Sequence, residues 1–150
     1  MNDSDLMRIA IKEAFIGIRK KHGNPFGAVV AKNGKIIARA HNMVFKQHDP
    51  TAHAEVTAIR KASKKLKNRH LEGCVIYCSS EPCPMCMCAI FWARMKKVYY
   101  ACGRNDAAKI GFGDALFYKL LSKGGKKNFS KQMMRKEALA VFGEWKRKKR

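Results

Sequence analysis

Two short motifs constrain this chain more than any other feature: His53-Ala54-Glu55, and the run PCPMC at residues 82–86. His53 and Glu55 lie two residues apart, about 200° around an α-helix, so in mid-helix they could not face one small site. They can share a site only in a first helical turn, where the chain enters a helix after Asp49-Pro50-Thr51. We therefore predict that a helix begins at this motif and that both side chains face a pocket at that end.

The second motif places Cys83 and Cys86 three residues apart. On a helix that opens at Pro84, a residue suited to the first helical position, the two thiols lie on one face and can bind one metal ion. Helix N-termini also favour the thiolate form that zinc requires. We predict that His53, Cys83 and Cys86 bind a single Zn²⁺ ion.

Each motif alone is unspecific, because a His beside an acid is common on protein surfaces and Cys-x-x-Cys also occurs in redox proteins. Two alternatives therefore stay open at this point. One is thioredoxin-like redox chemistry, and the other is a structural zinc site with Cys88 as its fourth ligand. Cys88 lies two residues beyond Cys86, off the shared helix face.

Three protein ligands are typical of a catalytic zinc, whose fourth position is open to water. Zinc lowers the pKa of such a water molecule toward about 7. A carboxylate at Glu55 could take the proton, pass it to a ring nitrogen and protonate the departing amine. The combination of His-x-Glu with Pro-Cys-x-x-Cys is typical of nucleobase deaminases, so the sequence predicts hydrolytic deamination.

The hydrophobic pattern predicts a three-layer α/β/α sandwich with a mixed sheet. Apolar spacing predicts a helix over residues 4–21 with Ser4 as its N-cap, and Asn33-Gly34 predicts an antiparallel hairpin between strands 27–31 and 35–40. A helix over 52–66, a strand over 74–80, a helix over 84–94 and a strand over 97–103 follow, and this order implies parallel pairing of the last two strands. Two further helices are expected over 114–121 and 134–149.

The length of 150 residues suits one domain, and no apolar run is long enough to span a membrane. The N-terminal residues lack the pattern of a secretory signal, so we expect a cytoplasmic protein. Of the six cysteines, Cys74, Cys78 and Cys102 fall in predicted strands and are expected to be buried core thiols. The remaining histidines are expected at the surface; they are His22, His41, His48 and His70.

The formal net charge is +21, and such a basic surface attracts nucleic acid, nucleotides or anionic membranes. From Lys123 to Arg150 there are eleven Lys or Arg against two Glu, a balance of 11 − 2 = +9, ending in KRKKR. Few aromatic residues interleave these charges, which favours a role in solubility over RNA binding. RNA nevertheless remains a candidate partner.

The residues HAEVTAIRKA from His53 and SSEPCPMCMCAIFWAR from Ser79 resemble guanine deaminases of the cytidine deaminase superfamily. NPFGAVV from Asn24 and NDAAKIGFGDALFYK from Asn105 extend the resemblance to residues 24–119. Gly113 stands where the family usually carries a first acid before Asp114. The resemblance implies zinc ligands at His53, Cys83 and Cys86, and a proton shuttle at Glu55. It also implies substrate contacts by Asn42 and Phe26, and recognition or protonation of the base by Asp114.

The reaction implied is removal of the amino group of guanine, a purine base, to give xanthine and ammonia. Guanosine, cytosine and tRNA adenosine remain alternative substrates within the enzyme class. A different class, a basic nucleic-acid-binding module with a structural zinc, would bind RNA and release no ammonia. The resemblance also implies a homodimer and one zinc ion per chain, and the lack of a long apolar run predicts no membrane partner.

Overall fold

The computed structural model of the chain describes residues 1–148. Strands β1 (Gly27–Lys32) and β2 (Lys35–His41) form the predicted antiparallel hairpin. Its turn is made by Asn33 and Gly34, whose φ angles of 49° and 72° lie in the left-handed region. Two successive residues with positive φ match the right-handed twist of the flanking strands, which is why Asn-Gly predicts the turn correctly.

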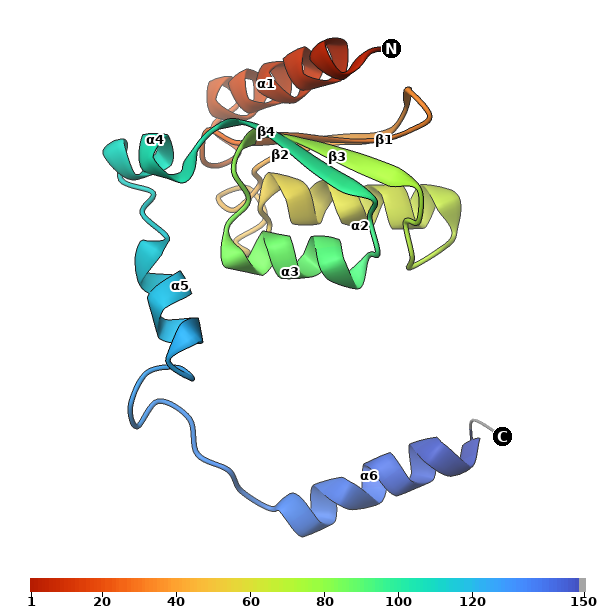
Figure 1. Cartoon of the computed structure of the whole chain (residues 1–150). Coiled ribbons are helices and arrows are strands. Elements are labelled where there is room, and N and C mark those ends of the chain that lie inside the picture. Colours follow the sequence, from red (N-terminus) through yellow and green to blue (C-terminus); the bar gives the residue numbers. More distant parts are fainter. Residues whose placement is uncertain (149–150) are drawn as a thin grey trace. The chain divides into compact units, whose positions relative to one another are not determined.

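The sheet has the strand order β2-β1-β3-β4. Strand β3 (Cys74–Ser80) pairs antiparallel with β1 and parallel with β4 (Lys97–Cys102), so the sheet is mixed as predicted. Helix α3 (Pro84–Trp92) connects the parallel pair. Helix α1 (Asp3–Arg19) covers one face, and α2 (Ala54–Leu66) covers the other face together with α3 (Figure 1). The predicted three-layer α/β/α architecture is confirmed.

The central strand β1 is apolar on both faces because successive side chains point in opposite directions. Val29 and Ala31 pack with Leu6 and Ala10 of α1. On the other face, β1 contributes Ala28 and Val30 to a larger core with α2, β2, β3 and α3. Small side chains line the α2 side of this core, namely Ala54, Ala58 and Ala62. Burial of these two faces holds the starts of α2 and α3 at one end of the sheet.

The N-cap predicted at Ser4 is wrong: helix α1 begins at Asp3, and Asn2 is its cap. The Asn2 Oδ1 atom accepts a hydrogen bond from the Asp5 backbone N–H at 2.8 Å. The Asp5 carboxylate in turn accepts from the Asn2 N–H at 3.4 Å. This reciprocal pair satisfies the backbone N–H groups of Asn2 and Asp5 at the helix start.

Four side chains that the sequence placed incorrectly are Cys102, His22, His41 and His70. Cys74 and Cys78 are buried as predicted, but Cys102 is exposed because it ends the edge strand β4. His22, His41 and His70 are half-buried instead of lying at the surface, and His48 is exposed as predicted. His41 contacts a buried carboxylate in α1, and His22 contacts His41, as described below.

The chain divides into two units after Asp114. The first unit also holds α4 (Arg104–Lys109), which the sequence pattern did not predict. The second contains α5 (Ala115–Ser122) and α6 (Arg135–Lys148), and none of its described side chains is buried. The single-domain assignment with a basic segment from about residue 123 therefore stays a prediction. Lys149 and Arg150 of the KRKKR run lie outside the described residues, and no helix within 1–148 has the length and hydropathy needed to cross a membrane.

Candidate active site

The two motifs each begin a helix, as the sequence predicts. His53 is the N-cap of α2 and Cys83 is the N-cap of α3, with Pro84 at its first position. Both caps have extended backbone, with φ and ψ of −63° and 157° at His53 and −66° and 169° at Cys83. Neither side chain makes a capping hydrogen bond to its own helix.

The three predicted ligands come together in one cluster. The His53 Nδ1 atom lies 3.5 Å from Cys83 Sγ and 3.4 Å from Cys86 Sγ, and the ligand atoms all lie within 4.8 Å of one another. A tetrahedral zinc with ordinary Zn–N and Zn–S bond lengths separates its nitrogen and sulfur ligands by about 3.6 Å. The residues therefore fit one zinc ion. Cys88 is exposed and lies outside this cluster, so within residues 1–148 the site has three protein ligands.

The two thiols of the cluster differ in acidity. A hydrogen bond from Cys86, with a further one from His53, lowers the pKa of Cys83 to about 4. The same contact with Cys83 raises the pKa of Cys86, and burial adds to this effect. The hydrogen bond to Cys83 also raises the pKa of His53. At neutral pH the metal-free cluster thus holds one thiolate together with protons that a metal ion must displace.

Glu55 lies in the first turn of α2 and is buried. Burial is the main cause that raises its pKa, and the negative charge of Cys83 acts in the same direction. His53 and a hydrogen bond with Cys86 partly oppose this shift. A carboxyl group whose pKa is moved upward toward neutrality suits a residue that both accepts and donates a proton.

Asp114 is far from the cluster in sequence, but the charge of Cys83 acts on its carboxyl group. Burial raises the pKa of Asp114, the nearby Arg104 opposes the shift, and the charge of Cys83 contributes to it. The Arg104 Nε atom lies 3.7 Å from the Asp114 carboxylate. The Glu81 carboxylate accepts hydrogen bonds from the Arg104 backbone N–H and Nη2, each at 3.0 Å. Sequence reasoning missed Arg104 and Glu81; the place of Glu81 directly before Pro82-Cys83 was the only signal for them.

Asn42 follows β2 directly and is almost fully buried. Its Oδ1 atom accepts hydrogen bonds from the backbone N–H groups of Asn24 at 3.0 Å and Val44 at 3.2 Å. Gly23 packs so closely that an added Cβ would lie 2.2 Å from this oxygen. The Nδ2 atom has no hydrogen-bond partner among residues 1–148. Asn42 therefore caps the turns around it and also keeps one donor for another molecule.

Phe26 lies beside Asn42, because the Phe26 carbonyl accepts the Asn42 backbone N–H at 2.9 Å. Its ring is half-buried and packs against the larger core. The Phe112 ring meets it edge-on, with centroids 5.1 Å apart and an interplanar angle of 81°. Core packing thus accounts for one part of the Phe26 ring, and its remaining surface is available for contact with a ligand.

Comparison with known proteins bears directly on this cluster. Residues 1–102 match a family described as the cytidine and deoxycytidylate deaminase zinc-binding region. The match includes both motifs and the whole sheet. The chain belongs to this deaminase family.

Among family members, a guanine deaminase of Bacillus subtilis is 46% identical over 97% of this chain and 94% of its own length. A tRNA-specific adenosine deaminase of Aquifex aeolicus is 41% identical over 67% of this chain and 66% of its own length. The X-ray structure of guanine deaminase from Bacillus subtilis matches with a TM-score of 0.92 and 44% identity, covering 98% of this chain and 95% of that one. The chain is thus a zinc-dependent deaminase with the cytidine deaminase-like fold, and its zinc ligands can be supplied by the His53–Cys83–Cys86 cluster.

Uptake of zinc by this deaminase is expected to release protons at pH 7. The raised pKa of Cys86 keeps a proton on its thiol in the metal-free cluster, and this proton must leave before the sulfur can bind the ion. Protons compete with zinc, so affinity should fall as the pH is lowered. Calorimetry in buffers of different ionisation enthalpy measures the release, with at least one proton per zinc expected. Uptake without proton release would contradict this reading, and Cys88→Ser should leave the value unchanged.

Proposed function

We propose that this chain hydrolyses guanine to xanthine and ammonia. The observation that carries the proposal is the three-ligand His53–Cys83–Cys86 cluster with the buried Glu55 carboxyl beside it. The similarity to a guanine deaminase over 97% of the chain supports guanine as the base. Water is consumed, the bond between the ring carbon and the amino group breaks, and the carbonyl of xanthine forms in its place.

Glu55 would carry the protons of this reaction. A zinc ion bound by the cluster would make a hydroxide nucleophile available near neutral pH. Glu55 would accept one proton of the attacking water and deliver it to a ring nitrogen. It would then take the remaining proton from the hydroxyl group on the attacked carbon and give it to the departing amine as the carbonyl forms. Burial raises the pKa of Glu55, which favours a carboxyl that can hold the proton between the two transfers.

Three further residues would bind the base. The free Nδ2 donor of Asn42 can bond to a carbonyl oxygen or ring nitrogen acceptor on the edge of guanine. The open surface of the Phe26 ring can pack against the purine. Asp114, which lies in the electrostatic field of Cys83, would recognise or protonate the base, and its raised pKa favours a carboxyl that can donate.

Asn42→Asp is expected to lower kcat/KM for guanine by roughly one to two orders of magnitude, mostly through KM. Aspartate keeps an oxygen to accept from Asn24 and Val44 but replaces the free donor with a second acceptor. Steady-state kinetics on zinc-loaded protein measures the effect. Asn68→Asp is the matched control, because Asn68 is exposed and also accepts a backbone N–H, that of His70 at 2.9 Å. Unchanged kinetics in Asn42→Asp would remove Asn42 from the binding site.

The proposed substrate is tested by incubating zinc-loaded protein with guanine, guanosine, cytosine and a tRNA that presents an accessible adenosine. Ammonia release from guanine alone, or fastest from guanine, supports the proposal. Preferential release from the tRNA would favour the function named for the Aquifex aeolicus relative, and the +21 charge is the feature of this chain that fits it. RNA binding without ammonia from any substrate would support the nucleic-acid-binding alternative.

We also propose that the protein is a homodimer in the cytoplasm. Helix α3 leaves Phe91 70% and Trp92 84% exposed, and an apolar surface of this kind is typical of protein contacts. All six cysteines are free, including the exposed Cys88 and Cys102, which fits a reducing compartment. Light scattering at several protein concentrations measures the oligomeric state, and a monomer at all of them would contradict the dimer.

A further inference from the structure

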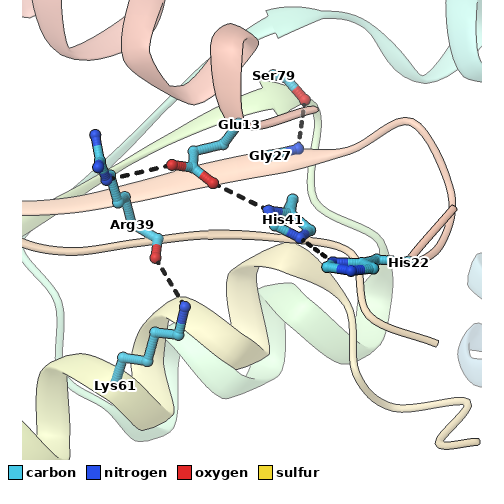
Figure 2. Close-up of polar contacts among 7 residues, drawn as sticks. All are labelled: Glu13, His22, Gly27, Arg39, His41, Lys61 and Ser79. Carbon is cyan, nitrogen blue, oxygen red and sulfur yellow. Dashed lines mark hydrogen bonds and ion pairs between the residues drawn. The ribbon is translucent and has the colours of Figure 1, made fainter. Parts of the chain in front are cut away.

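A partly buried chain of polar side chains lies outside the metal cluster and joins α1, the end of β2 and the loop after α1. The Glu13 carboxylate of α1 lies 3.0 Å from His41 Nδ1, and His41 Nε2 lies 2.9 Å from His22 Nδ1 (Figure 2). The two imidazole rings are also stacked, with centroids 5.1 Å apart. We call this chain, Glu13–His41–His22, the histidine relay.

Two neighbouring residues, Arg39 and Gly17, hold the relay in place. Glu13 is only 7% exposed, and Arg39 of β2 balances its charge with Nε at 3.3 Å from the carboxylate. Gly17 leaves the room that the His41 ring occupies, since an added Cβ would lie 3.0 Å from that ring. An unpartnered buried charge would be strongly destabilising, so the contacts with Arg39 and His41 hold the Glu13 carboxylate in this position. The close fit against Gly17 fixes the place of the His41 ring.

The hydrogen bonds of the relay determine which nitrogen of each imidazole ring carries a hydrogen. An ionised carboxylate only accepts hydrogen bonds, so His41 Nδ1 donates to Glu13. In neutral His41 the other nitrogen, Nε2, must then accept, and His22 Nδ1 donates to it. The Glu13 carboxylate therefore fixes the position of His22 through the His41 ring.

His22 in turn holds the two loops that carry the proposed base contacts. Its carbonyl accepts the backbone N–H groups of Phe45 at 3.1 Å and Lys46 at 3.0 Å. Two residues further on, the Asn24 N–H binds Asn42 Oδ1, and Phe26 follows. Hydrogen bonds thus join residues 22–26 to residues 42–46 on both sides of Asn42.

We propose that the histidine relay is a positioning device that sets the affinity of the site for its base by holding the loops of Asn42 and Phe26. Glu13, His41 and His22 act through these loops and not on the reacting atoms, so they are positioning residues. The proposal rests on the proposed function for the identity of the substrate. The structural part of it, that the relay orders residues 22–26 and 42–46, does not depend on any substrate.

The test compares His22→Leu with His22→Asn. Leucine fills similar space but has no hydrogen-bonding atom, whereas asparagine keeps a polar atom near the place of Nδ1. We expect His22→Leu to raise KM for guanine roughly tenfold with kcat changed less than about twofold, as for loss of one partly buried hydrogen bond. His22→Asn should restore most of the affinity. His70→Leu is the control, because the His70 ring makes no hydrogen bond within the described chain.

The dependence of KM on pH is a second measurement, and it would not change if the relay only filled space. If one of the two imidazole rings is protonated, the hydrogen bonds between Glu13 and His41 and between His41 and His22 can both remain. If both rings are protonated, His41 Nε2 and His22 Nδ1 each carry a hydrogen, and the two N–H groups face each other across 2.9 Å. Desolvation and nearby positive charges lower the pKa of His22, so this break should be favoured as the pH falls and should raise KM on the acid side of the profile. His22→Asn should lack this rise. The charged groups around the rings are Glu13 of α1, Arg39 of β2, and Lys20 and Lys46 of the loops.

Amide hydrogen exchange tests the relay without any substrate. Faster exchange at residues 22–26 and 42–46 in His22→Leu, with α2 and β3 unchanged and protection regained in His22→Asn, supports the proposal. Unchanged exchange and unchanged KM in His22→Leu overturn it. Global loss of protection in both variants would also overturn it, because it would show a general folding role. If wild-type protein does not act on guanine but the loop exchange behaves as expected, the proposed function fails and the relay stands.

Discussion

Replacing Glu55 with glutamine is expected to lower kcat for guanine by about three orders of magnitude while leaving the zinc content unchanged. Glutamine has nearly the same shape as glutamate but cannot take up or release a proton. Glu55 is buried beside the cluster, and burial raises its pKa, which fits its proposed role as the proton carrier. Ammonia release and metal analysis on the same preparation measure both quantities.

The matched control for this substitution is Glu72→Gln. Glu72 is exposed and pairs with Arg94 at 3.3 Å at the surface, so its loss should leave kcat within about twofold, as surface ion pairs contribute little. Activity retained in Glu55→Gln would end the assignment of Glu55 as the proton carrier. Loss of zinc in that variant would show that Glu55 supports the metal cluster instead.

Cys86→Ala is expected to abolish both zinc retention and deamination. The substitution removes one of three protein ligands from a buried position, and two ligands hold zinc at least about a hundredfold more weakly. Competition with a chromogenic chelator measures the affinity. Thermal unfolding with and without zinc gives a second readout, because an ion that binds the folded state raises Tm in the wild type and should no longer do so in the variant.

Cys88→Ser separates this site from a four-ligand structural zinc. Cys88 is exposed and outside the cluster, so its replacement should change neither zinc affinity nor kcat. Weaker zinc binding in Cys88→Ser would instead indicate a fourth protein ligand and a closed coordination shell.

For the Cys86→Ala variant, the contradicting outcome is full activity, which would exclude zinc chemistry at this cluster.

Local patterns carried most of what could be predicted. The Asn33-Gly34 turn, the helix start at Pro84 and the place of His53 at the entry of a helix each depend on a few neighbouring residues, and all three are confirmed. The metal ligands could be predicted because each motif confines its side chains to one helix end. The helix cap at Asn2 shows the limit of such reasoning, since Ser4 and Asn2 are both acceptable caps and only the contacts of Asp5 decide between them.

By itself the sequence predicted the His53–Cys83–Cys86 cluster, the mixed sheet and the place of Glu55 in a first helical turn, because spacing along one helix or strand controls which side chains share a face. Only the tertiary structure decided that Arg104 joins Glu81 to Asp114, that Asn42 keeps a free donor, and that Glu13 reaches His41 and His22. These contacts join residues far apart in the chain. Their geometry follows from which strands pair and which helix covers each face, and no local spacing encodes that information.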